Sequence, residues 1–522
     1  MEQFSKSRRK MLFILLSGLI LFFCSTASLL AETPKAGGEI KVRIRTDLVS
    51  TDPYKSTALI NANVLGHILE PLLAYNENLK IVPVVAERWE ASNDYKTYTF
   101  HLIKGKKFHN GQEMTAEDVN YSIKRMMNPE TCARAKLFDG VDRIEVVDKY
   151  TIKIHLQKSA AGFPHALAVI SPLMAILPKG EAERQGGEIK HPVGTGPFKF
   201  VEWKPDRHVI LEKFENYKGQ AGPRDGMGGE RIAYLDKVTF VPVPEESVSI
   251  MSLLNKEVDL MTGFPPKYMD KYRDEYSKKG VKVQEIPGLV WVGVHFGVTQ
   301  PVVDNVQFRQ ACAYALDIEQ LAKAAFMGYA EVNPSAVAKS NQYWTSAHEL
   351  FYKQDTSKSK ELLKKSGYNG EEILLTTTKK YNYFYKMAVA AHAQLQAVGI
   401  NVKLNVVDWP VLAKGQAKGE LQMYILGASP MPDPALAYAY LFRNKFLDVY
   451  PDVEELRQQA LNTADVKART ELFEQIHKLC YERVPWVLSC NYNRLQAHWD
   501  YVKGYQVLST SVPRLWGVWL EK

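Results

Sequence analysis

The chain has 522 residues, of which 46% are hydrophobic and 24% charged, and its formal net charge is +8. A chain of this length exceeds what one hydrophobic core organises, so we expect a globular protein of two or three domains. Its Lys and Arg residues are spread along the sequence without a basic block, which argues against nucleic-acid binding.

Residues 1–31 are typical of an export signal. The basic start Lys6–Lys10 precedes the apolar run Met11–Phe23, which is too short to span a bilayer comfortably. Cleavage after Ala27 and cleavage after Ala31 fit equally well, and the paired arginines leave Sec and twin-arginine export open. A lipid anchor at Cys24 and an uncleaved membrane anchor are the alternatives. We expect a soluble periplasmic protein. Because residues 1–31 carry four basic side chains and one acidic side chain, their removal leaves a net charge of +5.

The first half of the mature chain alternates in pattern between strand and helix. Apolar and polar residues alternate along Gly38–Arg45, Thr97–Leu102 and Tyr150–Leu156, which predicts strands. Thr115–Asp118 resembles a capping box and opens a helix with apolar residues at four-residue spacing. The Gly-rich, polar segment Gly219–Gly229 predicts a surface loop.

The second half favours helices that end at glycines and lead into strands. We expect helices at Asn305–Leu321, Ser357–Lys365, Tyr385–Val398 and Val466–Glu482. Gly367 and Gly399 follow two of these helices at positions that suit a helix C-terminus. A strand is expected at Asn401–Val407, and another at residues 487–488. Helix, glycine and strand in this order indicate an α/β domain.

Signatures of catalysis and of metal binding are absent from the sequence. There is no GxSxG, HExxH or GxxxxGK[ST] motif, and no histidine pair has metal-site spacing. The mature chain contains four cysteines without a CxxC pair: Cys132, Cys312, Cys480 and Cys490. A disulfide between Cys480 and Cys490 and buried free thiols both stay open. We expect no catalytic residue, no metal and no cofactor.

Five segments, in this order, resemble the family 5 extracellular solute-binding proteins, the peptide/nickel-type receptors of bacterial ABC importers: Val85–Arg125, Gly194–Tyr217, Val303–Asp317, Ser359–Tyr368 and Ala393–Leu404. The family's turn and helix start are matched by Lys107–Gly111 and Thr115–Val119, and its GTGP element by Gly194–Lys199. We interpret these segments as scaffold, with Asp118 at a helix start and Arg309 as a structural cation.

The resemblance implies an α/β protein with the two-lobed, class II fold of periplasmic binding proteins and a ligand cleft between the lobes. The first lobe is expected at residues 32–287 plus 490–522, with an inserted subdomain near 75–190, and the second lobe at 288–489. Pro287-Gly288 is the expected crossing between them. Closure of the lobes around a ligand excludes water and presents a distinct shape to the membrane permease.

The dipeptide-binding branch of the family uses two charges of the second lobe. Its carboxylate-binding Arg-Pro-Tyr-Asn run corresponds to Lys379–Asn382 here, so Lys379 and Tyr381 are candidate ligand contacts. Its GDNGDP run corresponds to residues 428–434, where Asp433 is retained but Pro430 replaces the amine-binding aspartate. Asp433 either serves the ligand or begins a helix. Because a buried ammonium without a partner is costly, an anionic ligand without a free amine fits best.

Three further aromatic residues, Trp291, Trp409 and Tyr54, are candidates for stacking on a ligand or for packing in the core. The expected function is that of a monomeric periplasmic receptor that presents a peptide-like or other small polar ligand to an ABC permease in the inner membrane. It is not an enzyme on this interpretation. An exported chaperone-like or sensor protein that binds peptides, and a hydrolase on the same scaffold, are the alternatives.

Overall fold

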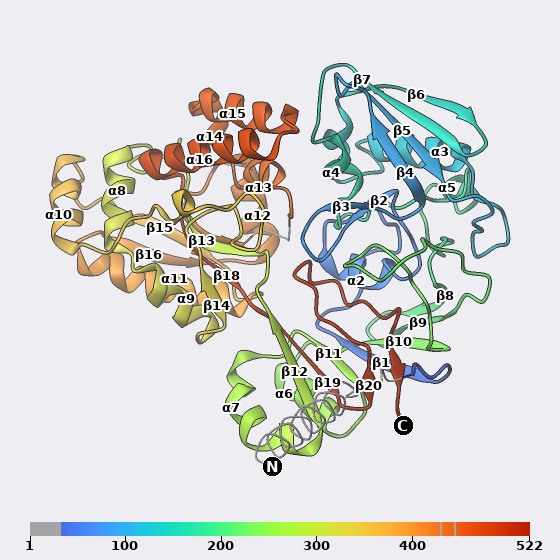
Figure 1. Ribbon diagram of the computed structural model, residues 1–522. Helices are drawn as coiled ribbons and strands as arrows, with labels where there is room; N and C mark the ends of the chain where they lie inside the picture. The colour runs from blue at the N-terminus through green and yellow to red at the C-terminus, as the bar shows by residue number, and fades with distance from the viewer. Residues whose placement is uncertain (1–32, 428–430, 443–444) are drawn as a thin grey trace, which may run out of the picture. The chain divides into compact units, whose positions relative to one another are not determined.

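The computed structural model describes residues 33–427, 431–442 and 445–522 (Figure 1). The predicted export signal and residues 428–430, which include Pro430, lie outside the described residues. The chain divides into two units, Met1–Lys35 and Ala36–Lys522, and the second contains all of the elements below. No helix in the described ranges has both the length and the apolar character needed to cross a membrane.

The first lobe contains a seven-stranded mixed sheet in the order β12-β19-β11-β1-β10-β9-β8. Its central strand β1 (Glu39–Ile44) pairs in parallel with β10 and β11 and buries Ile40, Val42 and Ile44, as the alternation predicted. The other strands are β8 (Phe198–Lys204), β9 (His208–Lys213), β10 (Lys237–Pro242), β11 (Leu260–Thr262), β12 (Val281–Ile286) and β19 (Arg494–Trp499).

Short elements make up much of the rest of the first lobe. They are α2 (Leu59–Leu65), β2 (Leu73–Tyr75), β3 (Ile81–Pro83), α4 (Phe163–Leu167), α5 (Glu181–Arg184), α6 (Glu246–Leu254), α7 (Met269–Lys271), β20 (Val502–Lys503) and β21 (Trp519–Leu520). The predicted loop Gly219–Gly229 contains neither helix nor strand.

An inserted antiparallel sheet follows the order β4-β5-β7-β6. Its strands are β4 (Ala86–Ala91), β5 (Thr97–Leu102), β6 (Val141–Asp148) and β7 (Thr151–Leu156), and α3 (Ala116–Met127) packs against β6 and β7. The predicted capping box is confirmed: the Thr115 side chain accepts from the backbone of Asp118, whose carboxylate accepts from Thr115 N at 2.8 Å.

The second lobe contains a six-stranded mixed sheet in the order β14-β18-β13-β17-β15-β16. Its strands are β13 (Trp291–Phe296), β14 (Ala330–Val332), β15 (Ile373–Thr377), β16 (Val402–Val406), β17 (Met423–Gly427) and β18 (Trp486–Tyr492). Because side chains alternate along a strand, β13 directs Val292 and Val294 into one core and Trp291 into another.

Helices cover both faces of this sheet. The core that contains Val292 takes side chains from α8 (Val306–Ala315), α9 (Ile318–Phe326), α10 (Thr356–Lys365) and α11 (Asn382–Ala397). The core that contains Trp291 takes side chains from α13 (Pro434–Leu441), α14 (Phe446–Val449), α15 (Pro451–Asn462) and α16 (Val466–Arg483). Helix α12 (Trp409–Lys418) contributes Leu412 to a small cluster with β17.

The helix predicted over Asn305–Leu321 is two helices. Helix α8 ends at Ala315, where Leu316 takes an extended conformation, and α9 begins at Ile318. The carboxylate of Asp317 accepts from Gln320 N at 3.0 Å and caps α9. The apolar spacing alone predicted one continuous helix, but the capping side chain of Asp317 begins a second helix.

The four described cysteines are free and buried. Cys480, on α16, belongs to the core that contains Trp291, whereas Cys490, on β18, belongs to the core on the opposite face of the sheet. The disulfide considered between them is therefore not formed, because the sheet separates the two thiols.

The chain passes between the two large sheets twice. The first passage joins β12 to β13 through Pro287 and Gly288, and the second joins β18 to β19 at Asn493. A Cβ at Gly288 would overlap the carbonyl oxygen of Tyr492, so the two passages pack directly against each other. The expected boundary between residues 489 and 490 falls inside β18, which still pairs with β13 at Asn491. The lobe limits otherwise stay a prediction.

Candidate ligand-binding site

Lys379 and Tyr381 lie in the short connection between β15 and α11. This is the carboxyl end of a strand in an α/β sheet, the edge where such sheets bind ligands. Lys379 is exposed, and its ammonium lies 5.1 Å from the ring centroid of Tyr385. Tyr381 is half-buried at the N-cap of α11. A cation and a phenol therefore both lie in the connection at this edge.

Five aromatic side chains lie close together here, and we call them the aromatic wall: Tyr381, Tyr383, Phe384, Trp409 and Tyr492. The rings of Tyr381 and Trp409 meet edge to face at 5.3 Å, and those of Tyr383 and Tyr492 lie 5.4 Å apart. Such pairs stabilise one another beyond simple burial. The wall joins residues of α11, α12 and β18 at the edge of a core of the second lobe.

The charge of Arg45, the residue that follows β1 in the first lobe, reaches the aromatic wall. Burial raises the pKa of Tyr381, and the positive charge of Arg45 opposes that rise. Burial likewise raises the pKa of Tyr383 well above its usual range, again against Arg45. Both phenols therefore stay protonated at neutral pH and keep an O–H group that can donate a hydrogen bond.

Asp433 begins a helix, one of the two interpretations the sequence left open. It is the N-cap of α13, where its carboxylate accepts from Leu436 N at 3.2 Å. It is fully buried and ion-paired with Arg469 at 2.7 Å, while His165 Nε2 of the first lobe lies 3.3 Å away. Burial raises its pKa, but Arg469 and His165 outweigh that effect and hold the pKa below its usual value. The carboxylate is thus neutralised within the protein.

Two of the expected stacking residues lie in cores. Tyr54 is fully buried in the first lobe, where its hydroxyl donates to Ala175 O at 2.5 Å and the Arg125 guanidinium lies 5.1 Å from its ring. Trp291 is 1% exposed at the start of β13, and its indole Nε1 has no hydrogen-bond partner among the described residues. The rings of Tyr381 and Trp409 thus meet, Lys379 lies two residues before Tyr381 in the same connection, and the other three candidates lie elsewhere.

The first lobe contains a buried cluster of charges that the sequence patterns did not predict. Glu70 is ion-paired with Lys106 at 2.7 Å and with Arg231 at 3.3 Å, and it accepts from Thr195 and Tyr217. Burial disfavours the charged form of Glu70, but Lys106 and Arg231 hold its pKa below the usual value. The signal was present: a lone glutamate within the apolar run Ile68–Tyr75 must find a buried partner.

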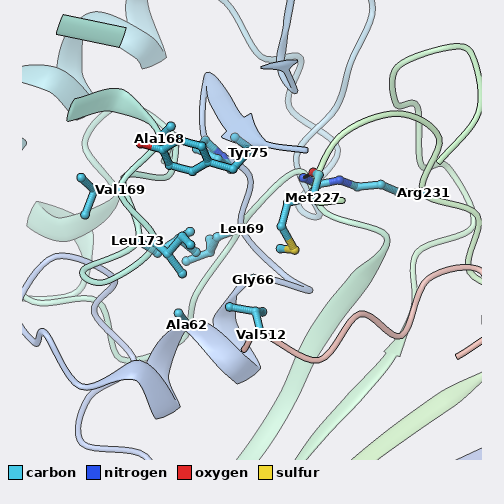
Figure 2. Close-up of a pocket in the computed structure, with 13 residues that line it drawn as sticks. Ala62, Gly66, Leu69, Tyr75, Ala168, Val169, Leu173, Met227, Arg231 and Val512 are labelled. Carbon is cyan, nitrogen blue, oxygen red and sulfur yellow. Dashed lines mark hydrogen bonds between the residues drawn. The ribbon is translucent and has the colours of Figure 1, made fainter. Parts of the chain in front are cut away.

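Arg231 also borders a small pocket of the first lobe (Figure 2). Its other walls are mostly apolar and include Leu69, Leu173, Met227 and Tyr75. The space inside is about 20 Å³, enough for a water molecule but not for a peptide. In this structure the pocket has no room for a ligand of peptide size.

Within the described ranges, no three His, Cys, Asp or Glu side chains gather closely enough to hold a metal ion.

Comparison with known proteins gives concordant results. Residues 80–446 match the model of the bacterial extracellular solute-binding proteins, family 5. The glutathione-binding protein GsiB of Escherichia coli O1:K1 is 27% identical, over 94% of this chain and 96% of the relative.

Solved structures confirm the two-lobed α/β fold. The periplasmic binding protein DppA of Helicobacter pylori, in complex with the peptide STSA, is 28% identical with a TM-score of 0.79, over 94% of this chain and 99% of that one. The binding protein AgaA of A. tumefaciens R10, in complex with agropinic acid, is 24% identical with a TM-score of 0.80, over 93% and 99%, and this likeness concerns the fold alone.

Proposed function

This chain belongs to the bacterial extracellular solute-binding proteins of family 5, the substrate-binding proteins of ABC importers, and we propose on that premise that its ligand is a short peptide or peptide-like anion. The observation that carries the proposal is the position of Lys379 and Tyr381 at the carboxyl end of β15, where Tyr381 is part of the aromatic wall and within reach of the positive charge of Arg45. A cation and neutral phenol donors suit a carboxylate, and aromatic faces suit the flat amide groups of a peptide.

This protein recognises the amino end of its ligand in a different way from the dipeptide-binding branch of the family. Asp433 is neutralised by Arg469, so it does not offer a free charge to an ammonium group. We therefore propose that the ligand carboxylate is the main charged anchor, with Lys379 as its partner and with Tyr381 and Trp409 as flanking contacts. Glutathione and Ser-Thr-Ser-Ala, the ligands of the two relatives at 27% and 28% identity, are the natural first probes.

The proposal predicts which end of the ligand matters. Binding is measured by isothermal titration calorimetry with Ser-Thr-Ser-Ala, its C-terminal amide and its N-acetyl form, and in parallel with glutathione. Removing a charge-assisted contact costs about 1.5–3 kcal/mol, so amidation is expected to weaken binding at least tenfold, and N-acetylation less than threefold.

A pair of variants tests the role of Lys379. Lys379→Met should reproduce the loss seen on amidation, whereas Lys364→Met, an exposed lysine near the end of α10, should leave binding unchanged. Loss of binding on N-acetylation, with amidation tolerated, would contradict the carboxylate-anchored mode.

The proposal extends to the setting of the receptor. Residues 1–31 are a cleaved export signal, the mature protein is a periplasmic monomer, and it delivers its ligand to an inner-membrane permease without catalysis. Family membership supports the receptor role, and the pattern of residues 1–31 supports export. Mass spectrometry of the protein from a periplasmic extract would give the cleavage site directly.

A further inference from the structure

The two lobes also meet through segments other than the chain passages. Gly162, the N-cap of α4 in the first lobe, donates its backbone N–H to Leu461 O at 2.7 Å. Leu461 lies in the last turn of α15 in the second lobe, where carbonyls have no partner within their own helix. A free donor at one helix start therefore meets a free acceptor at another helix end.

One helical turn farther along α4, His165 bridges the lobes. Its Nδ1 lies 2.9 Å from the Tyr75 hydroxyl, within the first lobe. Its Nε2 lies 3.3 Å from the Asp433 carboxylate and 3.4 Å from an Arg469 nitrogen, both in the second lobe. The imidazole thus joins a tyrosine of one lobe to an ion pair of the other.

Both sides of this contact are rigidly supported. In the first lobe, the Tyr98 hydroxyl donates to Ala160 O at 2.7 Å, which holds the segment before α4 on the inserted sheet. In the second lobe, Arg469 donates to Ala460 O at 2.8 Å and to the Tyr343 hydroxyl at 2.9 Å. Groups held in place before they meet lose little entropy on contact.

We propose that Gly162, His165, Asp433 and Leu461 form a closing latch, in which contacts of the protein with itself stabilise the closed state and so set ligand affinity without touching the ligand. The inference rests on the proposed function only where ligand release is concerned. The latch also gives Asp433 a role: when the lobes close, His165 of the first lobe contacts its carboxylate.

The latch offers a selective probe in Gly162. Its backbone has φ −81° and ψ −1°, which any residue adopts, and the three atoms nearest to an added Cβ all belong to Leu461, the closest being its carbonyl oxygen at 2.9 Å. Gly162→Ala should therefore be tolerated by an open protein and resisted by the closed one. Gly140→Ala is the matched control, because a Cβ at Gly140 meets nothing within 4 Å.

The first measurement uses small-angle X-ray scattering of the full ligand-free protein and needs no ligand. We expect Gly162→Ala to have a larger radius of gyration than the wild type and Gly140→Ala, with a thermal unfolding midpoint unchanged among the three. Identical scattering from all three folded proteins would overturn the latch, whichever ligand the receptor binds.

The second measurement uses His165→Phe, which keeps a ring against Tyr75 but removes both nitrogens. Stopped-flow release of glutathione, followed by tryptophan fluorescence, should be roughly tenfold faster in His165→Phe and Gly162→Ala than in the wild type, with association rates little changed. Equal release rates would contradict the latch, whereas failure of the wild type to bind glutathione would count against the proposed ligand and leave the scattering test decisive.

Discussion

At the scale of single residues, Lys379 and Asp433 differ in burial and in the partners of their charges. Lys379 is exposed beside aromatic rings, whereas Asp433 is fully buried and paired with Arg469 at 2.7 Å. A side chain already neutralised in a core has little to give a ligand, while an exposed cation at a strand end is free to bind one. Burial and pairing, rather than residue type, decide between the two roles.

Asp433 is therefore expected to matter for stability. Asp433→Ala leaves the Arg469 guanidinium buried without its counter-charge, which should lower the free energy of unfolding by about 3–5 kcal/mol. Asp433→Asn, which retains an acceptor for Leu436 N, should fall in between. Chemical denaturation followed by circular dichroism measures the change.

Asp465 supplies the control for this prediction, because it caps α16 in the same way but is exposed. Asp465→Ala should cost only about 1 kcal/mol, the ordinary loss of an N-cap. Equal losses at Asp433 and Asp465 would mean that the Arg469 pair contributes nothing to stability.

At the scale of elements, Arg309 links one helix to the end of another. Its guanidinium, buried on α8, donates to the carbonyls of Val303 and Asp304 before that helix and to those of Arg483 and Val484 at the end of α16. Burial lowers its pKa without changing its charge at neutral pH. The sequence interpretation of Arg309 as a structural cation agrees with this placement.

Only a guanidinium has enough donors, in a planar arrangement, for these carbonyls. We expect Arg309→Lys to lower the free energy of unfolding by about 2–3 kcal/mol, since several buried carbonyls lose their donor. The exposed Arg143, on β6, is the matched site, and Arg143→Lys should change stability by less than about 0.5 kcal/mol. Denaturation midpoints compare the two, and a neutral Arg309→Lys would show that the bonds are replaceable.

At the scale of the whole molecule, closure depends on contacts that are far apart in the chain. His165 and Arg469, 304 residues apart, meet at 3.4 Å. Burial lowers the pKa of His165; Asp433 raises it and Arg469 lowers it further. The groups that face the imidazole are Tyr75, Asp433 and Arg469, and their pKa values are moved away from the neutral range by their surroundings.

Closure is therefore expected to depend on pH through His165. The closed state favours the neutral imidazole. The contribution of His165 to the stability of the closed state is therefore fully present above the ordinary histidine pKa of about 6.5 and is lost as the pH falls below that value. The radius of gyration of the ligand-free protein should rise between about pH 7 and pH 5. His165→Phe should abolish this change, and a wild-type protein that scatters identically across the range would refute it.

The sequence by itself determined the local structure of this protein. Strand alternation, the capping box at Thr115 and the glycines after α10 and α11 were readable because they concern neighbouring residues, and Gly367 and Gly399 indeed have φ of +77° and +99°. The family resemblance added the two-lobed fold and the positions of Lys379 and Tyr381. The break between α8 and α9 was missed because apolar spacing outweighed one capping aspartate.

Only the tertiary structure decided which charges are free and which are used. Nothing near Asp433 in the sequence announces Arg469 or His165, and nothing near Glu70 announces Lys106 or Arg231. Such pairs form between distant segments because a buried charge requires a partner wherever the fold provides one. Neighbouring residues determine the helices and strands, but the packing of these elements decides whether a side chain lies in the core, in the contact between the lobes or at an exposed strand end.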